Sequence, residues 1–327
     1  MRKVKITGLG LGIPAKKVSS EELEEKYGIP AGFSEKYSGV SSRYFAETES
    51  CAQLGALALH DAMRDAGITC SDLDLLISAA GSYDHPIPHQ SALLKKEMNW
   101  GPNTIPVFDI DATCLSFVTA LDVATDLIGS GRYRRIAIVS SEIASRTANP
   151  HAFETFTLFG DGAAAAIIEA TEEDCGILTS RFETWEEGAL HTIFPGGGLK
   201  NFYRDHPYDP VFFSFHMDGM KLLKLARKTL PAFVEHLFQG TGLQMADMDL
   251  IIPHQASKAG LALFRADFNL PESQLHNTLD TFGNCIAASI PITLCDAVRK
   301  GRVERGDTLL LIGSAAGFTL GGMVLKY

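Results

Sequence analysis

One pattern occurs twice in this chain, as Ser71-Asp-Leu-Asp-Leu-Leu-Ile77 and as Ala246-Asp-Met-Asp-Leu-Ile-Ile252. Each copy is an acidic turn followed by a short apolar strand, and the copies are offset by 175 residues (72 to 247). Gly131-Arg132 and Gly301-Arg302 both precede further apolar runs, at an offset of 170 (131 to 301). An offset near half of the 327-residue length predicts two similar halves that share one structural plan.

Within each half, short β-rich runs alternate with helical patterns. In the first half we expect strands at 4–7, 75–78, 106–108, 136–140 and 163–169, and helices at 49–66 and 115–128. In the second half we expect strands at 250–252, 308–313 and 322–326, and helices at 214–238, 258–268 and 286–299. The segment 174–210 is expected to be irregular. This alternation favours a layered α/β fold, with halves 1–171 and 172–327.

The charge balance is acidic, with 29 Lys and Arg against 39 Asp and Glu and a formal net charge of −10. A nucleic-acid-binding protein is expected to present a basic face, so the balance argues against this class. No apolar run is long enough to span a bilayer, and the short, Gly-rich start lacks a signal-peptide cleavage site. We therefore expect a cytoplasmic protein with no nucleic-acid or membrane partner.

The six cysteines form no C-x-x-C pair and show no histidine spacing typical of zinc, so no metal site is expected. Cys114 differs from the others because it lies in Val107-Phe-Asp-Ile-Asp-Ala-Thr-Cys-Leu-Ser-Phe-Val118, a strand, a sharp turn and the start of a buried helix. The N-terminus of a helix lowers the pKa of a thiol, so this is a position for a nucleophile. A purely structural role for Cys114 is an equal alternative.

Two polar residues of the second half are candidate partners for this thiol. His254 follows the apolar strand 250–252, at the strand end where sites of α/β proteins gather. Asn284 lies 170 residues after Cys114, so the repeat predicts equivalent places near a pseudo-twofold axis. Helix capping is an alternative role for Asn284. Cys285 is the rival nucleophile, and we rank it lower because it lies one position past this equivalence.

A different motif, Gly10-Leu-Gly-Ile-Pro-Ala15, fits the dinucleotide-binding pattern G-x-G-x-x-G/A after an expected strand. No amphipathic helix with a buried stripe follows it at once, as that pattern requires. We therefore expect no bound dinucleotide.

Taken together, the motifs resemble the thiolase superfamily and, within it, the β-ketoacyl-acyl-carrier-protein synthase III family. The resemblance covers nearly the whole chain. It rests on Cys114 in its turn and on Phe159-Gly-Asp-Gly-Ala163, Pro253-His-Gln-Ala256, Gly283-Asn284 with Ala287-Ala-Ser-Ile-Pro291, and Ala316-Gly-Phe-Thr319. It implies a thiolase-like five-layered αβαβα fold from two similar halves, a homodimer and no resident cofactor.

The resemblance also implies roles for the site residues. The set Cys-His-Asn is similar to the synthase III type, whereas thiolases carry a second Cys, elongating synthases a second His and hydroxymethylglutaryl synthases a Glu. Cys114 would take the acyl group from acyl-CoA or another thioester, and a malonyl thioester would then lose CO₂ and attack it. His254 and Asn284 would donate to the enolate, and the N–H groups of Cys114 and Ala316 would form the oxyanion hole.

Several family positions that contact coenzyme A are altered in this chain. Phe33 and Tyr37 stand where the family has the Trp and Arg that stack on adenine, and Phe153 stands at a second family Arg. Ser257 replaces the Asn that usually follows the His-Gln-Ala motif, and Gly219 is a further expected substrate-binding position. These changes put the usual contacts to coenzyme A in doubt, and stacking on Phe33 or Tyr37 is the mode that remains.

Ile87 is the implied gate residue that would enter the acyl pocket of the partner subunit. The gate is aromatic in other members, and a smaller aliphatic residue would admit a longer chain. This leads to the hypothesis that the primer is a medium-chain acyl thioester rather than acetyl-CoA.

Docking of an acidic acyl carrier protein on this acidic chain would need a local basic patch. One expected helix carries four cations at helical spacing, and Lys258 beside the His motif would extend them. The four are Lys221, Lys224, Arg227 and Lys228. A solvated helix face explains the same pattern at least as well.

Three alternative functions stay open at this point. An acyltransferase on the same fold would pass the acyl group of Cys114 to an oxygen, a nitrogen or a small-molecule carbanion. A non-catalytic partner subunit of a synthase pair would not need the three site residues, and a Cys hydrolase would release free acid. Malonyl consumption with CO₂ release separates the condensing enzyme from the acyltransferase, and labelling of Cys114 by iodoacetamide or an acyl thioester tests the non-catalytic subunit.

Overall fold

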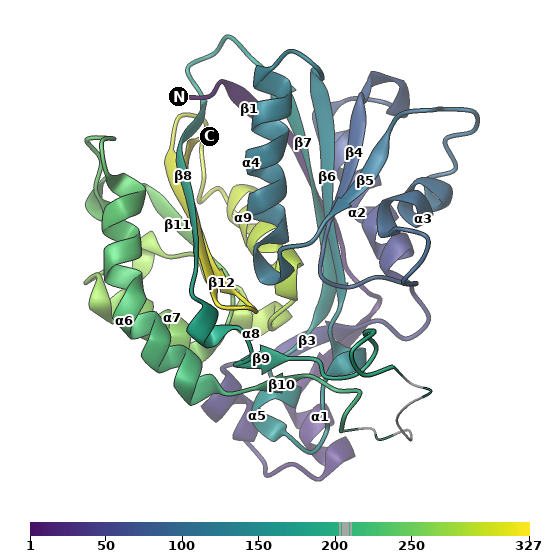
Figure 1. Cartoon of the computed structure of the whole chain (residues 1–327), viewed down its shortest axis with the longest axis vertical. Coiled ribbons are helices and arrows are strands. Elements are labelled where there is room, and N and C mark those ends of the chain that lie inside the picture. Colours follow the sequence, from purple (N-terminus) through teal and green to yellow (C-terminus); the bar gives the residue numbers. More distant parts are fainter. Residues whose placement is uncertain (203, 205–208, 210) are drawn as a thin grey trace.

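Two β-sheets face each other across a pair of central helices (Figure 1). The computed structural model describes residues 1–202, 204, 209 and 211–327. Within these residues, the strands of the first sheet lie in the order β1 (Val4–Gly12), β7 (Asp161–Ala170), β6 (Arg135–Ile143), β4 (Leu75–Ala79) and β5 (Val107–Ile110). Those of the second lie in the order β11 (Leu250–Pro253), β12 (Thr308–Ala315), β13 (Thr319–Lys326) and β8 (Gly176–Thr184).

Helices supply the other layers. The helices α4 (Ser116–Gly129) and α9 (Ser289–Arg299) lie between the sheets. The outer face of the first sheet packs against α2 (Cys51–Ala66) and α3 (Gln90–Glu97), and the outer face of the second against α6 (Gly219–Phe238) and α7 (Lys258–Asp267). The predicted five-layered αβαβα fold is thereby confirmed.

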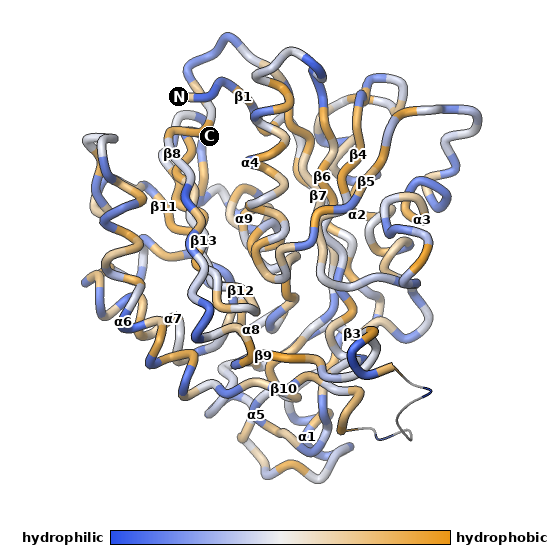
Figure 2. Tube along the Cα trace, in the orientation of Figure 1, coloured by the Kyte–Doolittle hydropathy of each residue, from blue (hydrophilic) through white to orange (hydrophobic). Residues whose placement is uncertain are grey.

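The central layer explains why α4 is apolar on almost every side. Phe117, Val118 and Leu121 are fully buried and pack in one core cluster with strands of both sheets. A helix that contacts a sheet on two opposite faces has little surface left for polar groups. Figure 2 shows the hydrophobic residues concentrated on the strands and inner helices, with hydrophilic residues at the outer loops.

Close packing of α2 on β1 explains the glycines of the dinucleotide-like stretch. A Cβ atom on Gly10 would lie 2.2 Å from the carbonyl oxygen of Ala58, and one on Gly12 would lie 2.0 Å from that of Leu54. Only residues without a side chain allow the helix to approach the strand so closely. These glycines therefore have a packing role in the first half.

The expected irregular segment 174–210 was predicted wrongly at its start. Residues 176–184 form β8, which pairs antiparallel with β13 at the edge of the second sheet. The helix expected from 214 begins at Gly219, because residues 216–217 pair as β10 (His216–Met217) with β9 (Thr192–Ile193). Part of the expected segment, residues 203, 205–208 and 210, lies outside the described residues.

The remaining elements lie at and below the lower edges of the two sheets (Figure 1). They are β2 (Lys16–Ser19), α1 (Ser20–Tyr27), β3 (Ser42–Phe45), α5 (Phe153–Phe156) and α8 (Leu279–Phe282). In the part of the chain that the structure describes, no helix combines the length and the apolar character needed to cross a membrane.

Candidate active site

Cys114 lies in a tight turn between β5 and α4. The turn consists of a short 3₁₀ segment, Thr113–Leu115, that leads directly into the helix. Thr113 has a left-handed backbone with φ of 50°, and its N–H donates to the Asp111 carboxylate at 2.8 Å. The Ser116 hydroxyl accepts from the N–H of Ala112 at 2.9 Å. These local bonds place Cys114 at the head of the buried helix, as the sequence predicted.

His254 follows β11 directly and is 4% exposed. Its N–H donates to the carbonyl of Ile312 at 2.8 Å, which continues the pairing of β11 with β12. Its ring Nδ1 is buried and has no hydrogen-bond partner among the described residues. Burial lowers the pKa of His254 to about 4, so the imidazole is neutral at physiological pH.

Asn284 is held by backbone from the first half of the chain. Its N–H donates to the carbonyl of Leu158 at 2.9 Å, and its carbonyl accepts from Gly160 at 3.2 Å. The side-chain amide donates to the carbonyl of Ala256 at 3.3 Å, and its oxygen accepts from Ile286 at 2.8 Å. Glycine is required next to it, because a Cβ on Gly283 would lie 2.6 Å from the Leu158 oxygen and Gly283 has φ of 69°.

The turn that carries Cys114 has a close copy in the second half, and the copy corrects the predicted equivalence. Ile286 has φ of 46°, like Thr113, and the Ser289 hydroxyl accepts from Cys285 at 3.0 Å, as Ser116 does from Ala112. The matching offset is 173 residues (116 to 289), not 170. The equivalent of Cys114 is therefore Ala287, and the prediction that it is Asn284 was wrong.

The three candidate residues and Ala316 line one cavity of about 670 Å³. Ala316 belongs to the β12–β13 turn, where Gly317 and Phe318 both have positive φ. The first turns of α6 form another part of the wall through Leu222 and Leu223. The fold thus brings the thiol, the imidazole and the carboxamide to one shared space.

Opposing influences act on the Cys114 thiol inside this cavity. Burial, followed by the carboxyl of Glu142, raises its pKa to about 12, although the N–H groups of Ala316 and of Cys114 itself and the Thr113 hydroxyl favour the thiolate. The expected lowering by the helix N-terminus is therefore present but smaller than the effect of burial. With this raised pKa, Cys114 is a thiol at neutral pH.

Cys285 does not compete as a nucleophile. It is fully buried, it is absent from the cavity wall, and its thiol faces the carbonyl of Phe282 at 3.5 Å. Burial raises its pKa well above the usual value. The sequence analysis also ranked Cys285 below Cys114, although it argued this from the equivalence of Cys114 with Asn284, which is wrong.

The predicted substrate-binding residues fall into two groups. Gly219 and Ser257 line the cavity. Phe33, Tyr37 and Phe153 lie outside its wall and pack on one another, with ring centroids 4.4 Å apart for Phe33 and Tyr37 and 5.9 Å apart for Phe33 and Phe153. Their roles in substrate binding stay predictions.

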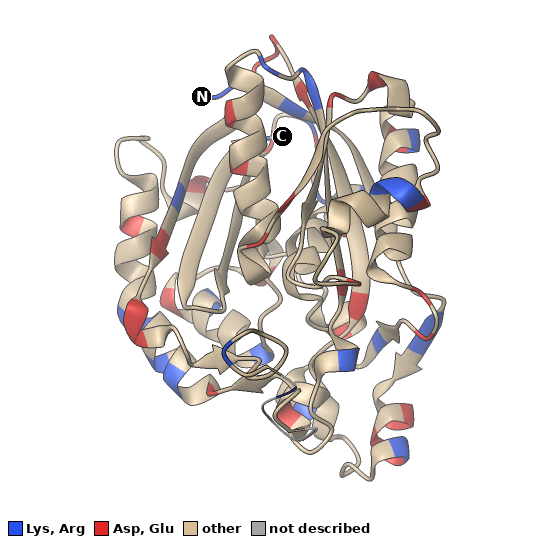
Figure 3. Ribbon diagram, turned by 45° about the vertical axis from the view of Figure 1, so that its right-hand side comes forward, with Lys and Arg blue, Asp and Glu red and all other residues tan. Residues whose placement is uncertain are grey.

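The predicted docking cations lie on the exposed side of α6 (Figure 3). Lys221 pairs with Asp218 at 2.9 Å and Lys228 with Glu187 at 3.1 Å. For Lys224 and Arg227, no ion pair forms with any residue that the structure describes. The separate cation Lys258 donates to the carbonyl of Glu35 at 3.0 Å.

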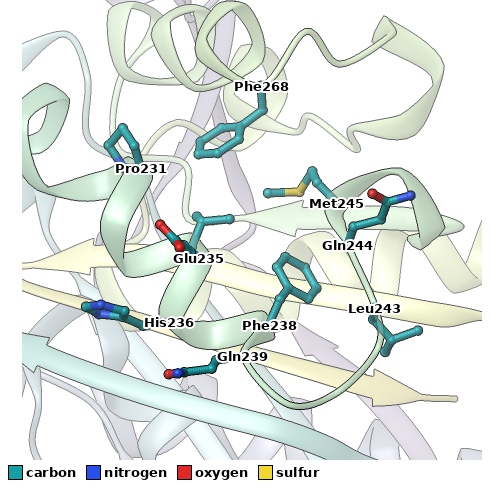
Figure 4. A pocket seen from close by; sticks show the side chains of 10 residues that line it. Pro231, Glu235, His236, Phe238, Gln239, Leu243, Gln244, Met245 and Phe268 are labelled. Carbon is teal, nitrogen blue, oxygen red and sulfur yellow. The ribbon is translucent and has the colours of Figure 1, made fainter.

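A second hollow, of about 630 Å³, lies on the outer side of the second half (Figure 4). Pro231 and Phe238 of α6 and Phe268 after α7 contribute to its wall. Its imidazole, His236, already contacts the Glu183 carboxylate at 3.0 Å. Because no thiol reaches this hollow, the cavity at Cys114 is the candidate active site.

One residue near the nucleophile was missed from the sequence. Glu142 is the next-to-last residue of strand β6, is fully buried and raises the pKa of Cys114. The available signal was a carboxylate that shortly follows the predicted apolar strand 136–140. A carboxylate that continues a buried strand is expected to have a hydrogen-bond partner, because a charged residue is rarely buried without one.

Comparison with known proteins gives a consistent result. The family model for 3-oxoacyl-[acyl-carrier-protein] synthase III matches residues 108–185, and the model for the C-terminal part of that family matches residues 238–327. A β-ketoacyl-[acyl-carrier-protein] synthase III from Vibrio vulnificus is 31% identical over 324 residues, 99% of each chain. One from Clostridium perfringens is 28% identical over 326 residues, 100% of each chain.

Solved structures agree with this result. The 3-oxoacyl-[acyl-carrier-protein] synthase III from Aquifex aeolicus superposes with a TM-score of 0.88 at 26% identity, over 99% of this chain and 100% of that chain. The corresponding enzyme from Pseudomonas aeruginosa gives a TM-score of 0.88 at 25% identity, over 99% and 98%.

Proposed function

The chain belongs to the 3-oxoacyl-(acyl-carrier-protein) synthase III family of condensing acyltransferases, and we propose that Cys114, His254 and Asn284 carry out its reaction. The observation that supports these roles is the shared cavity, which three distant segments of the chain line together. Condensation needs a nucleophile for the acyl group and donors for an enolate in one dry space.

In the first half-reaction, the Cys114 sulfur attacks the carbonyl carbon of an acyl thioester. A carbon–sulfur bond to Cys114 forms, the bond to the donor thiol breaks, and the proton of Cys114 ends on the departing thiol. The N–H groups of Cys114 and Ala316, which already favour a negative charge at the sulfur, would stabilise the tetrahedral oxyanion. Loss of one such donor typically lowers kcat by about 10²–10³-fold.

In the second half-reaction, a malonyl thioester loses CO₂ and leaves an enolate. A neutral His254 retains one N–H donor at physiological pH, because burial keeps it from being protonated. Asn284 uses one amide hydrogen on Ala256, which leaves the other for the enolate oxygen. The carbanion then attacks the acyl-Cys114 carbonyl, and collapse of the adduct releases the β-ketoacyl thioester and the Cys114 thiolate, which regains a proton.

The acyl primer is proposed to be of medium chain length. Ile87 is 87% exposed on the loop after β4, and Tyr83 of the same loop lines the cavity. Leu57 of α2 is 53% exposed as well. Such exposed apolar side chains suit an interface with a second copy of the chain, in which Ile87 would border the partner's pocket. Ile87→Phe should then shift the preferred primer towards shorter chains.

Malonyl delivery on an acyl carrier protein is proposed to use the two α6 cations that form no ion pair with a described residue. Lys224 and Arg227 lie on the same helix as Leu222 and Leu223, which line the cavity. An acidic carrier protein docked on these cations would therefore stand beside a wall of the active site. No cofactor is proposed, since the thioesters carry all the reacting groups.

The test is intact-protein mass spectrometry after exposure to a panel of acyl-CoA thioesters, followed by malonyl-carrier protein. The mass of one acyl group should be added, and it should be lost again with release of CO₂ and a β-ketoacyl product. C114A should take up no acyl group. Transfer of the acyl group without CO₂ release, or release of free acid, would contradict the assignment.

A further inference from the structure

The two copies of the turn are built alike, but different groups lie at their N–H donors. In the first, Cys114 lines the cavity, and its N–H is proposed to stabilise the oxyanion there. In the second, the equivalent N–H of Ala287 donates to Oε1 of Glu142 at 3.4 Å. A protein carboxyl therefore stands at the second turn in the place that a substrate oxygen would take at the first.

The difference comes from Glu142, near the end of β6, and from its equivalent in β12. Arg135 of β6 and Thr308 of β12 begin equivalent strands, and the same offset of 173 relates Glu142 to Ala315. Ala315 carries only a methyl group and lines the cavity. The small residue leaves the Cys114 turn open, whereas the carboxyl of Glu142 closes the Ala287 turn.

Glu142 also connects three segments that border the site. Its Oε1 accepts from the N–H of Gly81 at 2.8 Å, and Gly81 begins the cavity wall that continues through Asp84. Ala287 is three residues after Asn284, in the turn whose first N–H, that of Ile286, donates to the Asn284 side chain. One oxygen atom thus holds the Asn284 turn against the wall of the acyl cavity.

From these contacts we propose that Glu142 is a positioning residue of the condensation half-reaction, which holds the Asn284 turn through the acceptor oxygen Oε1. The proposal rests on the proposed role of Asn284 as a donor to the enolate. Glu142 is not part of the cavity wall, so it acts through Asn284 and does not touch the substrate. Without the acceptor, the N–H groups of Gly81 and Ala287 lose their partner and the turn is free to shift.

The ionisation of Glu142 fits an acceptor role. Burial raises its pKa to about 7, against the nearby Ser82 hydroxyl and the N–H groups of Gly81 and Ala287. Both the acid and the anion keep a carbonyl-type oxygen that can accept these bonds. An amide of the same shape should therefore replace the carboxyl in this role.

The experiment compares Glu142→Gln with Glu142→Met, which has similar volume but only a weak acceptor. Acyl loading of Cys114 is followed by intact mass, and condensation by the rate of CO₂ release from malonyl thioester. We expect E142M to lose at least about tenfold in condensation and clearly less in loading, because Asn284 is proposed to act only in condensation. E142Q should keep condensation within about threefold of the wild type, because its amide oxygen accepts the same N–H groups.

A thermal unfolding transition shows whether each variant is folded. If E142M does not fold, E142A takes its place. Equal losses in E142M and E142Q would show that the charge matters and not the acceptor, and would overturn the proposal. Wild-type condensation in a folded E142M would overturn it as well. N284A is measured in parallel: normal condensation there would refute the role of Asn284 itself, whereas an impaired N284A beside a normal E142M refutes only the role of Glu142.

Discussion

Adding one methyl group behind His254 should impair condensation without affecting acylation. In Gly313→Ala, the new Cβ would lie 2.6 Å from the Cβ of His254. An ordinary contact begins near 3.4 Å, so one of the two residues has to move by about 0.8 Å. Both are fixed by the pairing of β11 with β12, in which the His254 N–H donates to Ile312 at 2.8 Å.

The size of the expected rate loss follows from this displacement of about 0.8 Å. Moving a catalytic group by about 1 Å costs about 10²-fold in rate, which corresponds to about 2.7 kcal/mol of transition-state stabilisation. Overpacking of the same site should destabilise the fold by about 1–3 kcal/mol. Because His254 is proposed to act only on the enolate, the loss should fall on CO₂ release and not on the loading of Cys114.

The assay is the rate of CO₂ release from malonyl thioester by enzyme whose Cys114 has been acylated beforehand and checked by intact mass. Gly129→Ala is the matched control, since a Cβ there meets no atom within 4 Å. It should behave like the wild type in both steps. A folded G313A that condenses at the wild-type rate, or that loses acylation to the same extent, would refute the assignment of His254.

Three further predictions concern charge. Burial keeps the pKa of His254 near 4, so its ring resonances in an NMR titration should not shift between pH 5.5 and 8, and a midpoint near 6.5 would contradict a neutral donor. Burial raises the pKa of Asp296, but the hydrogen bond from His276 and the adjacent Lys300 hold this pKa below its usual value. The ionised Asp296 therefore stabilises the fold above about pH 4, and this stabilisation is lost as the pH falls. In urea denaturation at a series of pH values, D296N should show a smaller loss of unfolding free energy at acid pH than the wild type. The double variant Lys224→Glu/Arg227→Glu should raise KM for malonyl-carrier protein and leave KM for malonyl-CoA unchanged, and equal changes for both substrates would argue against docking on α6.

Local patterns in the sequence predicted much of the fold and the positions of Cys114 and His254. The buried character of α4 was visible as an apolar run, because a helix between two sheets excludes polar residues from nearly all its positions. The turn before it was visible as well, since the chain must pass from strand to helix within a few residues around Cys114. His254 was identifiable because it directly follows an apolar strand.

Other features depend on residues that are distant in sequence. Strand β8 escaped prediction because its pairing with β13 stabilises a stretch whose own pattern is weak. The glycines of β1 resembled a dinucleotide motif, and only the approach of α2 shows why Gly10 and Gly12 lack side chains.

The printed residues were sufficient to indicate two related halves, a thiol at the head of a buried helix and a histidine after a strand, because these depend on periodicity and spacing along the chain; Asn284 was chosen through an equivalence that the folded chain does not have. The equivalence of Cys114 with Ala287, the neutrality of His254 and the contacts of Glu142 came from the folded molecule. Hydrogen bonds and desolvation depend on distances between segments that the linear order leaves far apart, and the packing of the two sheets around α4 and α9 sets those distances.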